Sequence, residues 1–154
     1  MKQKEFKSYI NEFNATYIDN KDKIFTIIKI DNRIKFFVNI KLNHYIWILL
    51  FFKKKLHTMK LLKYYLNLKD ILNLKIRNLQ KNDLQMFNLH KLLLCKNDDW
   101  IIVVNNNLSD DVRLKLQEIL ISKVKSGGRI KIYSKSRIFK DIKGDDFEYN
   151  FFKT

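Results

Sequence analysis

The sequence predicts an α+β fold, and three patterns along its 154 residues support this class. Short runs of β-branched and aromatic residues indicate strands. Apolar residues spaced three and four apart indicate helices. Segments rich in Asn, Asp or Gly separate these runs and indicate turns. From residue 45 the predicted order is β-α-β-β-α-β, the split βαβ or ferredoxin-like arrangement.

This order divides the chain into three predicted parts. Residues 1–44 form an extension, residues 45–134 form the ferredoxin-like core, and residues 135–154 form a tail that is first basic and then aromatic and acidic. In the extension, apolar residues at helical spacing predict a helix over residues 4–13. Two β-rich runs, at residues 24–30 and 34–42, flank a turn at residues 31–33 and predict a hairpin.

The first half of the predicted core contains an unbroken apolar run at residues 45–52. A membrane-spanning helix needs ~20 apolar residues, so the run is interpreted as a buried strand. The next apolar residues repeat at helical spacing and predict a helix over residues 56–68. Residues 74–79 alternate and predict a second strand. Residues 80–98 have no clear pattern, and residues 80–83 and 96–99 have loop composition.

The second half of the core has clear start and stop signals. Trp100–Val104 is a β-rich run. Ser109 is a good N-cap for a helix whose first turn holds two Asp residues. Gly127 and Gly128 end this helix, and residues 129–133 form a final strand. The stripe predicted to be buried on the helix is Val112, Leu116, Ile119 and Leu120.

Charge gives the main indication of a partner. Thirty-one Lys and Arg residues face 16 Asp and Glu residues, for a net charge of +15. A net charge of about 2–8 already keeps a small domain in solution. Because the surplus opposes the compact fold by self-repulsion, a polyanion is the expected counterpart.

The composition also indicates an AT-rich genome, either of an organelle or of an AT-rich microbe. The chain has no Pro, three Gly and a single Ala, at position 15. Lys far outnumbers Arg, although Arg is the better bidentate phosphate ligand. The N-terminal residues lack both the apolar core of a secretory signal and the Arg-rich, acid-poor character of a transit peptide. We therefore expect an organelle-encoded protein of the mitochondrial matrix.

No motif for catalysis, cofactor binding or metal binding is present in the sequence. It lacks HExxH, CxxC, GxSxG, Walker A and GxGxxG patterns. Cys95 is the only cysteine, so neither an internal disulfide nor a Cys cluster for zinc is possible. Three pairs of adjacent Asp residues lie beside turns or a helix start, where solvated acids are normal. We expect no enzyme activity, cofactor, metal or small-molecule substrate.

The candidate RNA-binding residues are basic side chains near predicted turns and on one strand. They are Lys53, Lys54, Lys55, His57, Lys60, Lys91, Lys96, Arg129, Lys131, Lys135 and Arg137. Such side chains bind phosphates and carry little sequence information. This suits a protein packed into folded RNA.

With this order of elements, residues 45–134 resemble the small-subunit ribosomal protein S-ten family. Residues 46–52 would be its first strand, residues 74–79 its second, and Trp100–Val104 its third. The resemblance implies rRNA binding in the small-subunit head, beside neighbouring ribosomal proteins. It places Lys53, Lys54 and Lys55 on a basic turn, and Lys91 and Lys96 on an RNA-penetrating loop. This chain departs from the family in that loop, where Leu93-Leu94-Cys95-Lys96 replaces Arg-Ser-Pro-His.

Residues 100–139 also resemble the opening of the large-subunit stalk-base protein L-ten family, in which strand, helix and strand follow one another. That family has many more residues after this segment. Under both resemblances the expected role is a structural rRNA-binding constituent of an organellar ribosome. The alternatives are a peripheral subunit of an organellar membrane complex, without a membrane span, and a nucleic-acid-processing enzyme that uses His57 or His90 with an Asp.

Overall fold

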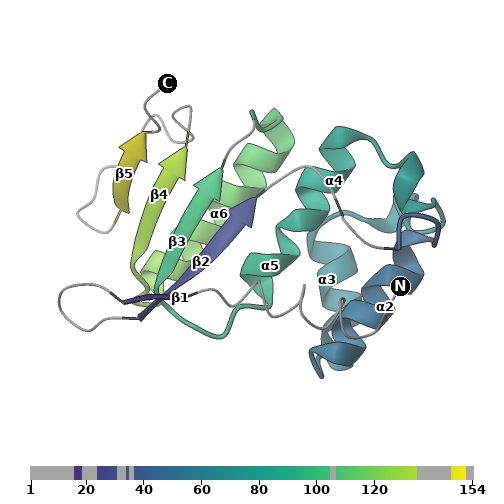
Figure 1. Cartoon of the computed structure of the whole chain (residues 1–154), viewed down its shortest axis with the longest axis horizontal. Coiled ribbons are helices and arrows are strands. Elements are labelled where there is room, and N and C mark those ends of the chain that lie inside the picture. Colours follow the sequence, from purple (N-terminus) through teal and green to yellow (C-terminus); the bar gives the residue numbers. More distant parts are fainter. Residues whose placement is uncertain are drawn as a thin grey trace.

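The computed structural model describes residues 16–18, 24–30, 34, 37–104, 107–134 and 147–151. They form a mixed α/β structure in which a sheet and a group of helices share a core (Figure 1). The five-stranded sheet has the order β1-β2-β3-β4-β5. β1 is antiparallel to β2, and each later strand is parallel to the one before it. The strands are β1 (Thr16–Ile18), β2 (Ile24–Ile30), β3 (Trp100–Val104), β4 (Ile130–Ser134) and β5 (Phe147–Phe151).

Isoleucine side chains in register form the centre of the helix-facing side of the sheet. Ile28 of β2 lies beside Ile102 of β3, which lies beside Ile132 of β4. All three are buried. β-Branched side chains suit a parallel sheet whose face is covered. Because successive residues of a strand point to opposite faces, Phe25 and Lys131 lie on the other face of the sheet.

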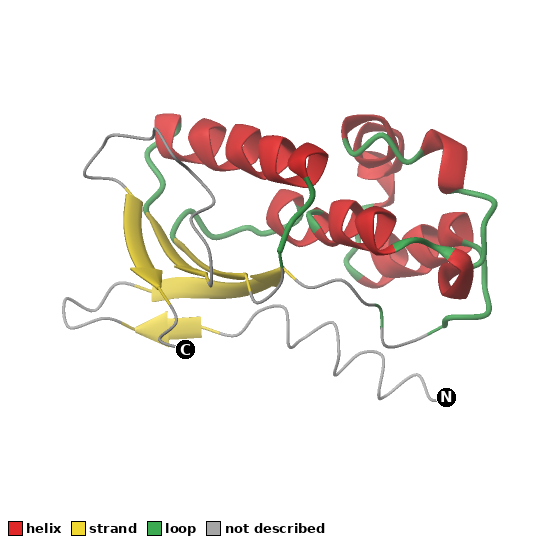
Figure 2. Cartoon of the chain, turned by 90° about the horizontal axis from the view of Figure 1, so that it is seen from above, coloured by secondary structure: helices red, strands yellow, loops and turns green. Residues whose placement is uncertain are grey.

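Helix α6 (Asp110–Lys125) connects β3 to β4 and lies along one face of the sheet (Figure 2). The Ser109 hydroxyl oxygen accepts a hydrogen bond from the backbone N–H of Val112 at 3.5 Å. The helix ends at Lys125, and Gly127 follows the C-cap Ser126 with a φ of +96°. The predicted strands at residues 100–104 and 129–133, the helix between them and its buried stripe are therefore confirmed.

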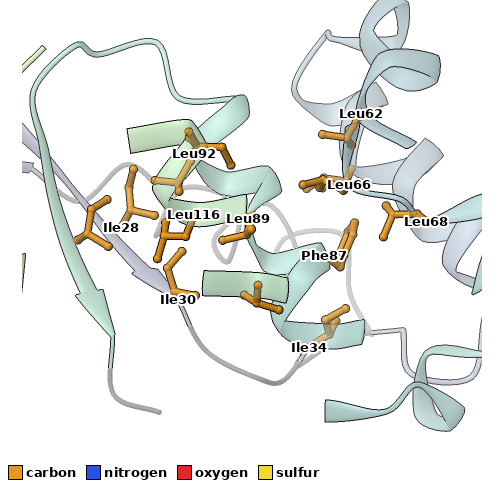
Figure 3. Packing of buried hydrophobic residues seen from close by; sticks show 14 of the residues in the cluster. Ile28, Ile30, Ile34, Leu62, Leu66, Leu68, Phe87, Leu89, Leu92 and Leu116 are labelled. Carbon is orange, nitrogen blue, oxygen red and sulfur yellow. The ribbon is translucent and has the colours of Figure 1, made fainter. Parts of the chain in front are cut away.

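A group of helices is inserted between β2 and β3 and lies beside the sheet (Figure 1). Its core is continuous with that of the sheet. Figure 3 shows Leu66 and Phe87 on the side of the inserted helices, Ile30 and Leu116 on the side of the sheet and α6, and Leu89 between them. The elements are α2 (Leu42–Phe52), η1 (Leu56–Thr58), α3 (Met59–Tyr65), η2 (Lys69–Ile71), η3 (Ile76–Asn78), α4 (Lys81–Asn88) and α5 (His90–Leu93).

The strand predicted at residues 45–52 is wrong, because this segment is the C-terminal part of helix α2. The buried side chains of α2 are Leu42, Tyr45, Ile46, Leu49 and Leu50. The steps between them alternate between three residues and one, as on one face of a helix. In an unbroken apolar run, this spacing is hidden by the other apolar residues. Length and periodicity cannot then separate a strand from a buried helix.

The strand predicted at residues 74–79 is also wrong. The segment holds the single turn η3, and only Lys75 makes an isolated bridge, with Lys41. The alternation of Leu74 and Ile76 does not mark one buried face, since Leu74 is exposed and the buried residues are Ile76 and Leu79, three positions apart. Residues 80–83, predicted as a loop, begin α4 instead, since the backbone N–H of Gln80 donates to Asp83 at 3.2 Å.

The N-terminal predictions are tested in part. The strand at residues 24–30 is confirmed as β2, but its neighbours in the sheet are β1 and β3. The predicted partner at residues 34–42 runs into α2 at Leu42, so the hairpin is wrong. The predicted helix at residues 4–13 and the turn at residues 31–33 lie outside the described residues. Part of the predicted tail, Phe147–Phe151, is strand β5.

The described strands are not arranged as in a split βαβ. In that fold another strand lies between the two strands that a helix connects. Here β3 and β4, which α6 connects, are direct neighbours in register. The expected mixture of helices and strands is present, whereas the predicted ferredoxin-like order is not what these residues form.

Candidate nucleic-acid interface

The lysine triplet follows directly on the C-terminus of α2. The Lys55 N–H donates to Leu50 O at 2.8 Å, and the Lys54 N–H donates to Phe51 O at 3.1 Å. These bonds form a Schellman motif, in which the residue at C′ is left-handed. Lys54 takes that position with φ +55°, although glycine is favoured there. The motif projects an exposed cation from the negative end of the helix dipole.

Lys53 connects the triplet to the loop before β3. Its side chain is half-buried, and this burial lowers the pKa of its ammonium group. Cys95 raises this pKa and the positive charge of Lys96 lowers it, so both lie close to Lys53. Lys96, about forty residues further along the sequence, therefore lies within electrostatic range of Lys53.

His57 and Lys60 extend this basic surface along η1 and α3, and both are exposed. The turn that leads to them is fixed by Thr58, whose hydroxyl donates to Lys55 O at 2.6 Å. This bond lies within the turn of η1, whose N-cap is Lys55. His57 and Lys60 therefore follow the triplet on a defined backbone.

Lys91, on α5, is the last of the predicted basic residues near Lys53. Its ammonium group donates to the backbone oxygen of Lys29 at 3.0 Å, near the end of β2. The pKa of His90 is lowered to about 3, mainly by burial and in smaller part by the nearby charges of Lys91 and Lys53. Lys53 and Lys91 thus lie near the same imidazole. We call the resulting cluster the basic corner: Lys53, Lys54, Lys55, His57, Lys60, Lys91 and Lys96.

The other predicted residues lie beside the loop before β3, on the sheet, or outside the described residues. Arg129 is exposed, and its backbone N–H donates to Asp99 Oδ1 at 3.0 Å. The Lys131 ammonium group lies 4.9 Å from the centre of the Phe25 ring, on the sheet face opposite α6. Lys135 and Arg137 are not among the described residues. Of the two described members of the second basic run, Lys131 therefore lies on the sheet face that α6 does not cover, and Arg129 lies beside the loop before β3.

Two aromatic residues beside the basic corner were missed by sequence reasoning. Trp47 and Phe51 are 49% and 52% exposed, and their rings stack at 5.3 Å with planes 12° apart. Phe52 lies against Phe51 at 5.8 Å with planes 81° apart. The prediction of a strand at residues 45–52 placed these rings in the core. The spacing of four between Trp47 and Phe51 is the sequence signal that a helix assignment would have used.

The two histidines considered for catalysis lie in different surroundings. His90 is buried in the core and stacks on Phe87 at 4.4 Å. His57 is exposed at the basic corner. The part of the chain that the structure describes holds no group of three His, Cys, Asp or Glu residues that could bind a metal ion. A cavity of about 420 Å³ between α3, α5 and α6 is mainly apolar, with Leu61, Leu92 and Ile119 in its lining.

No protein-family model and no curated protein matches this sequence. Among the described residues, no helix combines the length and the apolar character that crossing a membrane requires.

Proposed function

We propose that this chain is an RNA-binding protein and that the basic corner is its main contact surface with RNA. The observation that carries the proposal is that Lys53 feels the charge of Lys96 and, with Lys91, acts on the same buried imidazole of His90. Four further basic residues of the corner follow Lys53 within seven positions, in a chain with a net charge of +15. Lysine clusters of this kind bind phosphate and release condensed counterions. Most of the binding free energy would then depend on salt.

The proposed role in the cell is a structural constituent of an organellar, mitochondrial ribosome. Its partners would be ribosomal RNA and the neighbouring ribosomal proteins of the same subunit. The charge and the AT-rich codon usage support this role. The small-subunit resemblance loses two of the strands on which it depended, since residues 46–52 and 74–79 are not strands. The strand–helix–strand order of β3, α6 and β4 agrees with the large-subunit resemblance.

Sedimentation of the native protein, with and without ribonuclease, tests this role. The expected result is co-migration with one ribosomal subunit that is lost when RNA is digested, and the subunit identifies which resemblance holds. Migration with membranes or as a free small protein would contradict the ribosomal role. Binding to purified RNA measured over a range of salt concentrations tests the RNA contact itself. Affinity that does not fall with salt would contradict it.

A peripheral subunit of a membrane complex is the second candidate, because Trp47 and Phe51 are exposed beside lysines. Aromatic and basic residues on one helix also suit an interfacial helix on an anionic bilayer. Flotation of the protein with anionic vesicles tests this candidate. Vesicle binding at physiological salt, without RNA binding, would favour it over the proposal.

A further inference from the structure

We infer that the stacked rings of Trp47 and Phe51 bind unpaired bases, so that the preferred ligand is single-stranded RNA rather than duplex RNA. This inference rests on the proposed RNA-binding function and names the kind of RNA that the same surface takes. Three aromatic rings of this helix form a row. Phe52 packs against Phe51, and Phe51 stacks on Trp47, so Trp47 is the outer end of the row.

The exposure of this pair is not explained by the stability of α2 alone. The helix already buries its other side through Tyr45, Ile46 and Leu49. A pair of aromatic residues spaced four apart stabilises a helix by only about 0.2–0.5 kcal/mol. Half of each side chain remains in contact with water. A flat ligand on the indole ring would remove this apolar area from water.

Positive charges lie at both ends of the aromatic pair. Lys54 follows Phe51 by three residues and is held in place by the Schellman motif. At the other end, the Lys63 ammonium group donates to the side chain of Asn43, one turn before Trp47. Asn43 and Lys54 are about 16 Å apart along the helix axis, at 1.5 Å per residue. A short strand could thus place phosphates at both ends and bases between them.

This arrangement discriminates between single-stranded and duplex RNA. In a duplex the faces of the bases are stacked on each other, and proteins reach mainly phosphates, 2′-hydroxyls and shape. In a single strand every base has an available face, and aromatic side chains stack on it with little sequence preference. Lysines alone would bind both forms. The aromatic pair between lysines adds binding energy only for unpaired bases.

The fluorescence of Trp47 gives a direct test, because the only other tryptophan, Trp100, is buried and lies under the Lys123 ammonium group at 4.9 Å. The full chain would be titrated with an unstructured oligouridylate of about 12 nucleotides. A blunt RNA duplex of the same length, inorganic polyphosphate and vesicles of anionic phospholipid would be titrated in parallel. The expected result is quenching of Trp47 emission by the oligouridylate only. The Trp47→Phe variant, which keeps a stacking ring, should bind without this signal.

Substitution of the rings provides the second measurement. Trp47→Ala should weaken oligouridylate binding by about 5- to 100-fold and leave duplex binding unchanged. Leu114→Ala is the matched control, since Leu114 is 61% exposed on α6 and lies away from the basic corner. It should bind both RNAs as the unaltered chain does. Circular dichroism of each variant confirms that it folds, which is expected because both side chains are largely exposed.

The possible outcomes separate the two proposals. Salt-sensitive binding of duplex and oligouridylate with equal affinity, without a change in Trp47 emission, would overturn this inference and leave RNA binding in place. The absence of binding to either RNA would overturn both. A blue shift of Trp47 emission with vesicles alone would assign the aromatic pair to a membrane surface, which also overturns the inference.

Discussion

Gly128 lies so close to Asp98 that a Cβ atom on the glycine would be 2.5 Å from the Asp98 carbonyl oxygen. Such a Cβ would also lie 2.9 Å from Lys123 Cγ and 3.1 Å from Lys123 O. The backbone of the turn after α6 therefore packs directly on the loop before β3. The Lys123 ammonium group strengthens this contact by donating to Asp98 at 2.8 Å.

Gly128→Ala is expected to destabilise the protein by about 1–3 kcal/mol, because backbone on both sides of the glycine must move. Gly127→Ala is the control, since a Cβ there meets nothing within 4 Å. Its φ of +96° still costs about 1–2 kcal/mol. Urea denaturation of both variants measures the difference. A Gly128→Ala variant as stable as the unaltered chain would contradict this prediction. It would show that the loop before β3 can move to accommodate the added Cβ atom.

The segment from β3 to β4 could be predicted because its signals are local. Ser109, the two Asp residues after it and Gly127 each mark a helix end through their own backbone chemistry. The sheet order could not be predicted in the same way. Whether β2 pairs with a nearby run or with β3 depends on how the helical insertion packs, and no residue of β2 encodes this.

Lys54→Gly is expected to stabilise the protein by about 1 kcal/mol, because glycine adopts φ +55° without the Cβ strain of lysine. The same change removes one charge from the basic corner. The slope of log affinity against log salt should therefore fall by about 0.7 for single-stranded RNA. Thermal denaturation and RNA titration measure the two effects.

Lys60→Gly is the matched control for Lys54→Gly. It removes the same charge from an exposed residue within α3, where the backbone is right-handed. It should lower stability by about 1 kcal/mol and reduce the salt slope to a similar extent. Equal effects of the two substitutions on stability would contradict the left-handed conformation of Lys54.

His90 makes the stability of the protein depend on pH. Burial lowers its pKa from 6.5 to about 3 in the folded state. Below pH 6.5 the unfolded chain therefore binds a proton that the folded chain does not bind. The free energy of unfolding should fall as the pH drops from 6.5 toward 3, with a loss of about 1–2 kcal/mol between about pH 7 and pH 5.

Urea denaturation at these two pH values measures the loss in the unaltered chain and in two variants. His90→Gln should remove most of the difference between the two pH values, whatever its effect on absolute stability. His57→Gln alters an exposed imidazole and should leave the difference unchanged. A difference that persists in His90→Gln would assign the pH dependence to other groups.

The candidate site could be predicted only where neighbours in sequence are neighbours in space. Lys53, Lys54 and Lys55 form one turn, so their clustering follows from the sequence alone. The positions of Lys96 and Lys91 relative to Lys53 depend on how the inserted helices pack together, which no local pattern specifies. The sequence does not reveal the exposure of Trp47, because the residues on both sides of it are also apolar.

Lys96→Gln and Lys131→Gln together map the face of the molecule that contacts RNA. Lys96 is exposed at the basic corner, whereas Lys131 lies over Phe25 on the sheet face opposite α6. Lys96→Gln should therefore lower the salt slope of RNA binding by about 0.7–0.9, and Lys131→Gln should leave it unchanged. Both substitutions remove one positive charge, so a general effect of net charge would lower the salt slope of the two variants equally. A larger effect of Lys131→Gln would place the RNA on the opposite face of the sheet, because a phosphate contact is lost only where the lysine faces the strand.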